Sequence, residues 1–273
     1  MGRNRKPLLF LGARQVGKTF LLQEFGKTEY KQLAYINFEQ PNAPRSLFET
    51  DFDADRIITV LNAYCSLKIN AEDTLIVFDE IQAAPKGLTA LKYFYENASE
   101  YHVIGAGSLL GVTIHPEESF PVGKVDFMKL YPMSFYEFLL AMGEVGMAEL
   151  IERKDLENLH YFHLKLIQYL RYYLFVGGMP EAVKDFAENR DWGSTRHIQN
   201  QILASYRSDF SKHAPKEILP RITMVWDSIP AQLSKENKKF IYGVIKHGAR
   251  AKEFELAIQW LTDAGLLHKV FNT

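Results

Sequence analysis

The chain has 273 residues, of which 47% are hydrophobic, and its 32 lysines and arginines nearly balance its 33 aspartates and glutamates. This composition is typical of folded globular proteins and excludes disorder as the dominant state. The formal net charge of −1 argues against a nucleic-acid-binding protein with a globally basic surface, but it leaves a local basic patch open.

Short apolar segments alternate with amphipathic segments through the first half of the chain. Strands are predicted at residues 7–11, 33–38, 75–78 and 101–105, and helices at residues 19–25, 53–67 and 85–98. The second, third and fourth strands are nearly continuous in apolar character, which is typical of central parallel strands. The alternation therefore predicts an α/β fold, in which helices cover both faces of a parallel sheet.

A glycine-rich motif follows the first predicted strand. Its residues, Gly12-Ala13-Arg14-Gln15-Val16-Gly17-Lys18-Thr19, match G-x-x-x-x-G-K-[ST] and precede a predicted helix, as a phosphate-binding loop requires. Glycines at both ends let the loop curl so that backbone N–H groups point at an anion, and the helix adds its positive dipole. Lys18 can then reach the β- and γ-phosphates of ATP, and the Thr19 hydroxyl can bind Mg²⁺. A glycine-rich turn without a ligand is the alternative.

Two acidic residues, Asp79 and Glu80, end the apolar strand at residues 75–78. Ligands gather at the carboxyl edge of a parallel sheet, so Asp79 is predicted to meet the Mg²⁺ bound by Thr19. Glu80 would then orient or deprotonate the attacking water, as in an ATP hydrolase rather than a kinase. Alone, this acidic pair would be interpreted as a helix cap, but together with the phosphate loop it is interpreted as a catalytic pair.

Ser108 follows the next predicted strand, beside the strand that ends in Asp79. A small hydroxyl at this place can contact the attacking water or the γ-phosphate, so Ser108 is the candidate sensor. The alternative is a hydroxyl that only stabilises a turn.

The second half of the chain is predicted to be mostly helical, because apolar residues recur at helical spacing from Ser134 onward. Ser134 and Glu137 have the spacing of a capping box, and Gly177-Gly178-Met179-Pro180 is expected to separate two helices. We expect three domains: a P-loop core at residues 1–132, a helical region at 133–215, and a winged-helix-like module at 216–273 that the chain's end truncates.

The winged-helix prediction depends on a helix from Lys252, a glycine turn and the strand-like pair Leu266-Leu267. Such modules can place a helix in the major groove of DNA. Basic residues that could contact a phosphate backbone are Lys235, Lys238, Lys239, Lys246, His247, Arg250 and Lys252. A solvated helical face that contacts protein is the preferred interpretation, and DNA is the alternative partner.

Other residue types narrow the function further. The single cysteine, Cys65, excludes an internal disulfide framework and a multi-cysteine metal site, and the histidines lack metal-binding spacing.

No apolar stretch is long enough to span a membrane and no signal peptide fits, so a cytoplasmic protein is expected. The aromatic residues Tyr161, Phe162, Tyr169, Tyr172, Tyr173 and Phe175 are interpreted as packing residues, with a base-stacking platform as the alternative.

The motifs together resemble a known family. The segments that support the resemblance are residues 12–19, 35–39, 78–82, 107–108, 130–138 and 177–181. They resemble prokaryotic AAA-type ATPases, whose ATP-binding domain precedes a helical and winged-helix region and a C-terminal domain of unknown function. The resemblance covers essentially the whole chain, and it implies an AAA-like P-loop NTPase that binds ATP with Mg²⁺ and hydrolyses it. It also implies that the full-length protein is longer than this chain.

One residue departs from the family pattern. Gly123-Lys124 stands where family members often have Gly-Arg. A lysine can supply charge but not the two parallel hydrogen bonds of an arginine finger. Three hypotheses follow: an ATPase whose nucleotide state moves the C-terminal region, a nucleotide-gated switch with little hydrolysis, and a DNA-associated motor. A second copy of the chain or another protein is the expected partner.

Overall fold

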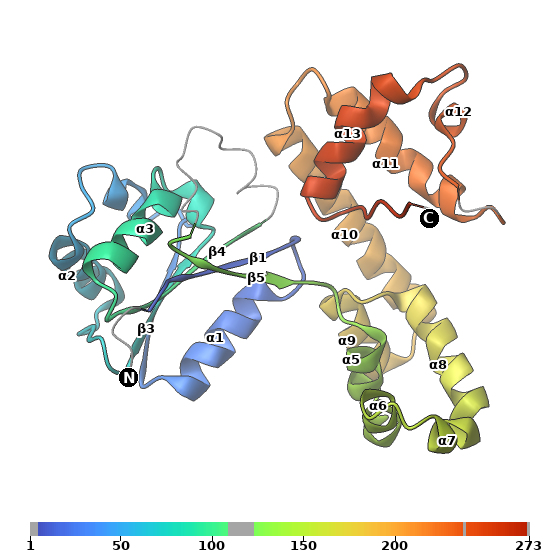
Figure 1. The fold of residues 1–273 in the computed structure, drawn as a ribbon, viewed down its shortest axis with the longest axis horizontal. Helices are drawn as coiled ribbons and strands as arrows, with labels where there is room; N and C mark the ends of the chain where they lie inside the picture. Colours follow the sequence, from blue (N-terminus) through green and yellow to red (C-terminus); the bar gives the residue numbers. More distant parts are fainter. Residues whose placement is uncertain (1–4, 109–122, 237–238, 272–273) are drawn as a thin grey trace. The chain divides into compact units, whose positions relative to one another are not determined.

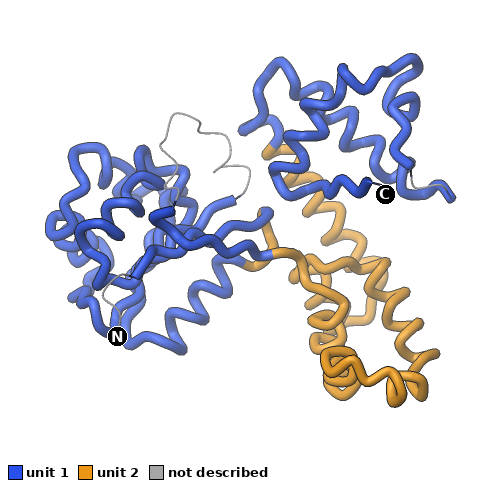
Figure 2. The backbone as a smooth tube through the Cα atoms, viewed as in Figure 1, with its two compact units in different colours: residues 1–13, 18–130, 210–273 blue, residues 14–17, 131–209 orange. Residues whose placement is uncertain are grey.

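The computed structural model describes residues 5–108, 123–236 and 239–271 (Figure 1). It divides into two compact units (Figure 2). Unit 1 contains Met1–Ala13, Lys18–Leu130 and Phe210–Thr273, and unit 2 contains Arg14–Gly17 and Tyr131–Asp209. The chain therefore crosses between the units inside the phosphate loop. The three domains expected from the sequence stay a prediction.

Five parallel strands form the sheet of unit 1, in the order β2-β3-β4-β1-β5. The strands are β1 (Leu8–Gly12), β2 (Gln32–Asn37), β3 (Thr74–Asp79), β4 (His102–Ser108) and β5 (Asp126–Leu130). The predicted α/β fold with a parallel sheet is confirmed. Strand β4 lies between the strand that precedes the phosphate loop and the strand that ends in Asp79.

Alternating side chains of the strands enter two separate hydrophobic cores. Leu9, Ile76 and Phe78 are buried on the face covered by α2 (Ala54–Cys65) and α3 (Gly87–Asn97), whereas Phe10 and Val77 are buried on the face of α1 (Lys18–Glu29). Figure 1 shows these helices on opposite sides of the sheet. Every residue of β3 is buried. The sheet is thus rigidly packed where β3 positions Asp79.

Two strands differ from the sequence prediction. Strand β2 was expected to be central, but it lies at an edge of the described sheet. Its apolar character comes from its covered faces, because Ala34 and Ile36 are fully buried in the core that α2 covers. Strand β5 was not predicted. Its residues Phe127 and Met128 are about half exposed, so the strand lacks the buried apolar pattern that would identify it.

Unit 2 is built from helices. They are α5 (Phe135–Ala141), α6 (Val145–Glu152), α7 (Leu156–Leu159), α8 (His163–Val176), α9 (Pro180–Asn189) and most of α10 (Trp192–His213). The predicted capping box is present, because the Ser134 hydroxyl accepts from the Glu137 backbone N–H and the Glu137 carboxylate accepts from the Ser134 N–H. Gly177 follows α8 and Pro180 begins α9, as predicted.

A close backbone approach joins the start of α5 to the turn between α8 and α9. The Met133 N–H donates to the Gly178 carbonyl at 2.7 Å. A β-carbon at position 178 would overlap the backbone of Met133. Gly178 is therefore required by the contact itself, since its own φ is not in the left-handed region.

The C-terminal part of unit 1 is a small helical module. Its helices are α11 (Leu219–Leu233), α12 (Tyr242–Ile245) and α13 (Ala251–Asp263). Val225 and Leu261 are buried, and Phe210 contacts Trp260 with ring centroids 5.6 Å apart. The expectation of a strand at Leu266-Leu267 is wrong, because residues 264–271 form no strand and so have no described pairing partner. The winged-helix assignment stays a prediction.

Candidate nucleotide-binding site

The phosphate loop connects β1 to α1 and uses the left-handed region at two positions. Gln15 has φ 64° and Gly17 has φ 94°, whereas Gly12 ends β1 and pairs with Ser108 of β4. The prediction that both glycines allow the loop to curl is therefore correct for Gly17 and wrong for Gly12. The sheet constrains Gly12 to an extended conformation, and Gln15 adopts the left-handed turn instead.

Lys18 places a buried positive charge within the loop. The residue is 6% exposed, and its Nζ donates to the Gly12 carbonyl at 3.1 Å and to the Ala13 carbonyl at 2.9 Å. A buried ammonium is stable only with such partners. The arrangement keeps the charge close to the backbone N–H groups of the loop, where phosphate oxygens can replace the carbonyl partners.

Thr19 and Asp79, the predicted Mg²⁺ ligands, are in direct contact. The Thr19 hydroxyl donates to Asp79 Oδ2 at 2.8 Å, although 60 residues separate them in sequence. Asp79 is 1% exposed, and its Oδ1 accepts from the Glu80 backbone N–H at 3.0 Å. A hydroxyl and a carboxylate side by side are the hard oxygen donors that Mg²⁺ prefers, so the residues present fit this ion.

Tyr35 is a member of this cluster that the sequence reasoning did not identify as a site residue. It lies on β2, and its hydroxyl donates to Asp79 Oδ2 at 2.5 Å. Burial and the hydrogen bond to Asp79 raise the pKa of the Tyr35 hydroxyl. The available signal was positional, because Tyr35 pairs with Val77 near the carboxyl edge of the parallel sheet.

Glu80 follows β3 with a left-handed backbone, φ 50°. Burial raises the pKa of its carboxyl group, and the nearby Asp79 charge adds to that effect. The Gln82 amide donates to Glu80 Oε2 at 2.6 Å and acts in the opposite direction by stabilising the carboxylate. Gln82 was not predicted as a site residue. A half-buried glutamate with a raised pKa and a fixed orientation has the properties of a general base.

Ser108 ends β4 and is 1% exposed. It pairs with Gly12, the first residue of the phosphate loop. Ser108 therefore lies next to the loop and on the strand beside β3, as the sequence predicted. Its role as a sensor stays a prediction.

The middle of the phosphate loop contacts α10 within unit 2. Arg14 Nη1 lies 2.8 Å from Asp209 Oδ1, the Tyr206 hydroxyl donates to the Arg14 carbonyl at 2.6 Å, and the Gln15 amide donates to Ser205 Oγ at 3.0 Å. Burial, together with the Asp209 charge, raises the pKa of Tyr206 to about 12. About 190 residues separate the partners, so no local sequence signal identified the α10 residues.

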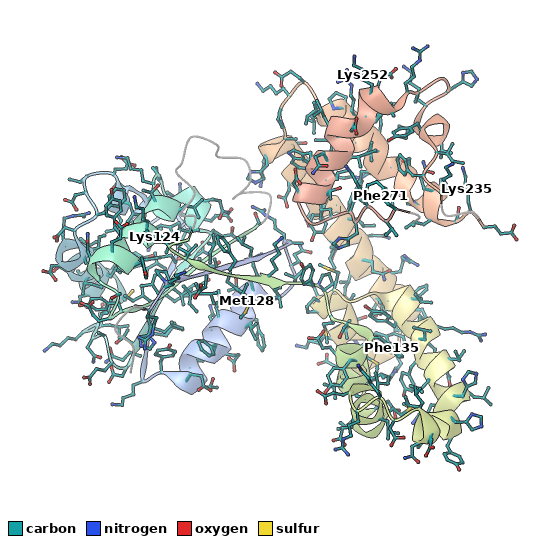
Figure 3. The ribbon with its side chains drawn as sticks, in the orientation of Figure 1. Lys124, Met128, Phe135, Lys235, Lys252 and Phe271 are labelled. Carbon is teal, nitrogen blue, oxygen red and sulfur yellow. The ribbon has the colours of Figure 1, made fainter. Side chains whose placement is uncertain are left out.

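Lys124 contacts two side chains of α3. Its Nζ lies 3.4 Å from Glu96 Oε1 and 5.2 Å from the ring centroid of Tyr95. Figure 3 labels Lys124 on unit 1. These contacts balance its charge on the surface of unit 1. Lys124 therefore already has an acidic partner in the arrangement that the structure describes, and it lacks the guanidinium fork of an arginine finger.

The remaining sequence hypotheses concern metals, membranes and DNA. Across the described residues, no three histidine, cysteine, aspartate or glutamate side chains are grouped to hold a metal ion. Within the same ranges, no helix combines the length and apolar character needed to cross a bilayer. Of the basic residues in the C-terminal module, Lys238 lies outside the described residues, and Figure 3 labels Lys235 and Lys252. DNA stays an alternative partner.

The fold and the site define the class of protein. A phosphate loop after β1, an acidic residue at the end of β3 and a five-stranded parallel sheet form a P-loop NTPase fold of the AAA type, followed by a mostly helical region.

Comparison with known proteins agrees with this class. Residues 4–139 match a family described as an AAA domain, and residues 167–273 match a family described as a domain of unknown function, DUF8612. The N-terminal half of the chain is therefore similar to AAA domains, and the C-terminal part is similar to a domain of unknown function. A search of curated proteins finds no match to the sequence.

The structure is similar to that of a Walker-type ATPase of Pyrococcus abyssi. The TM-score is 0.57 and the sequence identity is 15%, over 95% of this chain and 85% of that chain. At this identity the similarity establishes a common fold only.

Proposed function

We propose that this protein binds ATP together with Mg²⁺ at residues 12–19 and hydrolyses it. The observation that supports the proposal most strongly is the 2.8 Å contact between Thr19 and the buried Asp79, beside a phosphate loop that contains the Lys18 ammonium. Isolated glycine-rich turns have no reason to bring a helix hydroxyl and a strand-end carboxylate together. This arrangement favours a phosphate and metal site over a structural turn.

Each residue has a distinct role in the proposal. Lys18 and the loop N–H groups bind the phosphates, and Thr19 and Asp79 hold the metal ion. Mg²⁺, when bound, neutralises negative charge on the phosphates. Glu80 accepts a proton from the attacking water, and Ser108 hydrogen-bonds to the γ-phosphate or that water. Tyr35 is a positioning residue, because its hydroxyl fixes one oxygen of Asp79.

Replacing Asp79 with asparagine tests the metal assignment. We expect the Mg²⁺ concentration for half-maximal ATP hydrolysis to rise at least about tenfold, since the metal loses an anionic ligand. Phosphate release measured across a Mg²⁺ titration gives this value. Asp55→Asn, an exposed residue on α2, is the matched control. An unchanged Mg²⁺ dependence in Asp79→Asn would show that Asp79 does not hold the ion.

We further propose that nucleotide binding is transmitted through Arg14 and Gln15 to α10. The support is the set of three contacts from residues 205–209 to the loop, including the buried Asp209. Phosphates that bind to the loop's N–H groups must favour one loop conformation, and these contacts let α10 respond to it. This is the route by which ATP would change the helical part of the chain.

Hydrogen exchange in α10 measures this coupling. Adding Mg-ATP to the wild-type chain is expected to slow exchange at residues 202–209, because an ordered loop supports the helix. Asp209→Asn should reduce that protection at saturating ATP, since the charged partner of Arg14 is lost. Gln201→Ala, an exposed change on the same helix, should retain it. Equal protection in Asp209→Asn and the wild type would exclude the proposed route.

A switch with slow hydrolysis is the second candidate function. The observation that favours it is the engagement of Lys124 by Glu96 and Tyr95, which leaves no substitute for an arginine finger at this position. Turnover distinguishes the candidates. An ATPase completed by a neighbouring copy hydrolyses faster per chain as protein concentration rises, whereas the switch stays near background at every concentration.

A further inference from the structure

A pocket of about 370 Å³ lies within unit 2 and includes no residue of the phosphate loop. Side chains from three segments line it: Lys165, Gln168, Tyr169 and Tyr172 from α8, Phe186 from α9 with Arg190 directly after that helix, and Trp192 from the start of α10. Its volume is within the range of about 300–1,000 Å³ that small-molecule sites occupy. None of these residues has a role in the proposed ATPase.

Three aromatic rings form one wall of the pocket. The Trp192 ring centroid lies 4.6 Å from that of Phe186 and 5.4 Å from that of Tyr172. Phe186 is fully buried and fixes the cluster, whereas Trp192 remains 43% exposed. Packing therefore explains part of this aromatic surface, and a partly exposed, rigid ring is left to stack against a planar ligand.

The charges around the pocket favour an anion. Glu144 does not line it, and both of its oxygens are occupied, by Lys165 Nζ at 2.7 Å and by the Tyr169 hydroxyl at 2.6 Å. The Arg190 guanidinium lies 5.3 Å from the Phe186 ring centroid and has no hydrogen bond or ion pair with a described residue. No carboxylate is among the described lining residues. The Glu144 carboxylate also acts on Arg190 electrostatically, without a hydrogen bond between them. Because this one carboxylate is shared with Lys165, the two cations leave a net positive charge beside the pocket, and Arg190 presents it with a planar donor set.

Gln168 adds a hydrogen-bonding edge. Its Nε2 donates to the Tyr172 hydroxyl at 2.5 Å, which orients the amide. Its amide oxygen accepts no hydrogen bond from a described residue, so it can accept one from a heterocyclic N–H.

We propose that this pocket binds a nucleotide unit, with the base against Trp192 and the phosphate at Arg190. A planar heterocycle that carries an anionic group matches the aromatic wall, the amide edge and the guanidinium together. A free mononucleotide and one nucleotide of a single strand share this chemistry. The site is separate from the ATP site of the proposed function, and it stands if that function fails.

The test uses the full chain and two probes, thymidine monophosphate and a fluorescein-labelled twelve-nucleotide oligothymidylate. Arg190→Ala is expected to lower the affinity for at least one probe about tenfold, and Arg171→Ala, an exposed arginine of α8 that does not line the pocket, should leave it within about twofold. Any binding to the phosphate loop is common to both variants and cancels. If Arg190→Ala loses affinity for the monophosphate, the ligand is a free nucleotide. If it loses affinity for the oligonucleotide alone, the ligand is a single strand.

A second variant tests the stacking surface. Trp192→Leu, with its fold checked by circular dichroism, should also lower the affinity for the probe whose binding Arg190→Ala weakens. The proposal is overturned if neither probe binds the wild-type chain, or if Arg190→Ala and Arg171→Ala bind both probes alike. Competition by inorganic phosphate as strong as that by thymidine monophosphate would also overturn it, since the base would then contribute nothing.

Discussion

Glu80→Gln is expected to slow ATP hydrolysis by about 100-fold or more while ATP still binds. Glutamine is nearly isosteric but cannot accept a proton from water, and a positioned general base contributes about 10²–10⁴ to the rate. Phosphate release under single-turnover conditions measures the loss. Glu72→Gln, an exposed change that follows α2, is the control and should leave the rate unchanged. Equal rates in Glu80→Gln and the wild type would remove Glu80 from catalysis.

The pH dependence of hydrolysis provides a second readout of the same residue. Glu80 must be ionised to act as a base, so activity is lost as the pH falls through its pKa. Burial raises that pKa, and the acidic limb should therefore lie at higher pH than an ordinary glutamate would give. Gln82→Leu removes a hydrogen bond that stabilises the carboxylate and should move the limb further upward. A limb that does not move in Gln82→Leu would contradict the assignment.

Lys18→Ala is expected to reduce ATP affinity at least about 100-fold, which corresponds to about 2.7 kcal/mol. The ammonium is buried within the loop, where it can bond both the β- and γ-phosphates. Calorimetric titration with ATP measures the effect. Lys27→Ala is the control, because Lys27 lies on the same helix but is exposed and pairs with Glu24. Similar affinities in the two variants would place the phosphates elsewhere.

The local parts of the site were predictable from the sequence. Residues 12–19 are contiguous in the sequence, so the phosphate-loop motif could be recognised directly. Asp79 ends an apolar strand, and the direction of that strand determines the edge of the sheet at which Asp79 lies. The contact between Thr19 and Asp79 followed from the parallel topology alone, since parallel strands bring their carboxyl ends to one edge.

The parts that depend on distant pairing were not predictable. Tyr35 and Gln82 contact the acidic residues through strand register and a short turn. Both lie in segments that support the family resemblance, but residue type and spacing alone do not distinguish them from packing residues. Asp209 meets Arg14 across 195 positions of sequence. Strand β5 was not predicted from the sequence, because an exposed edge strand has no buried face to give it an apolar pattern. In each case tertiary contacts, rather than local propensity, determine the arrangement.

The central claim is a single ATP site that depends on Mg²⁺ and is built from residues 12–19 and Asp79. The most direct measurement is a calorimetric titration of the wild-type chain with ATP, performed with millimolar Mg²⁺ and repeated in excess EDTA. We predict one molecule of ATP per chain with Mg²⁺ and an affinity at least about tenfold lower in EDTA. Absence of saturable binding in both titrations, or an affinity that does not change with Mg²⁺, would contradict the claim.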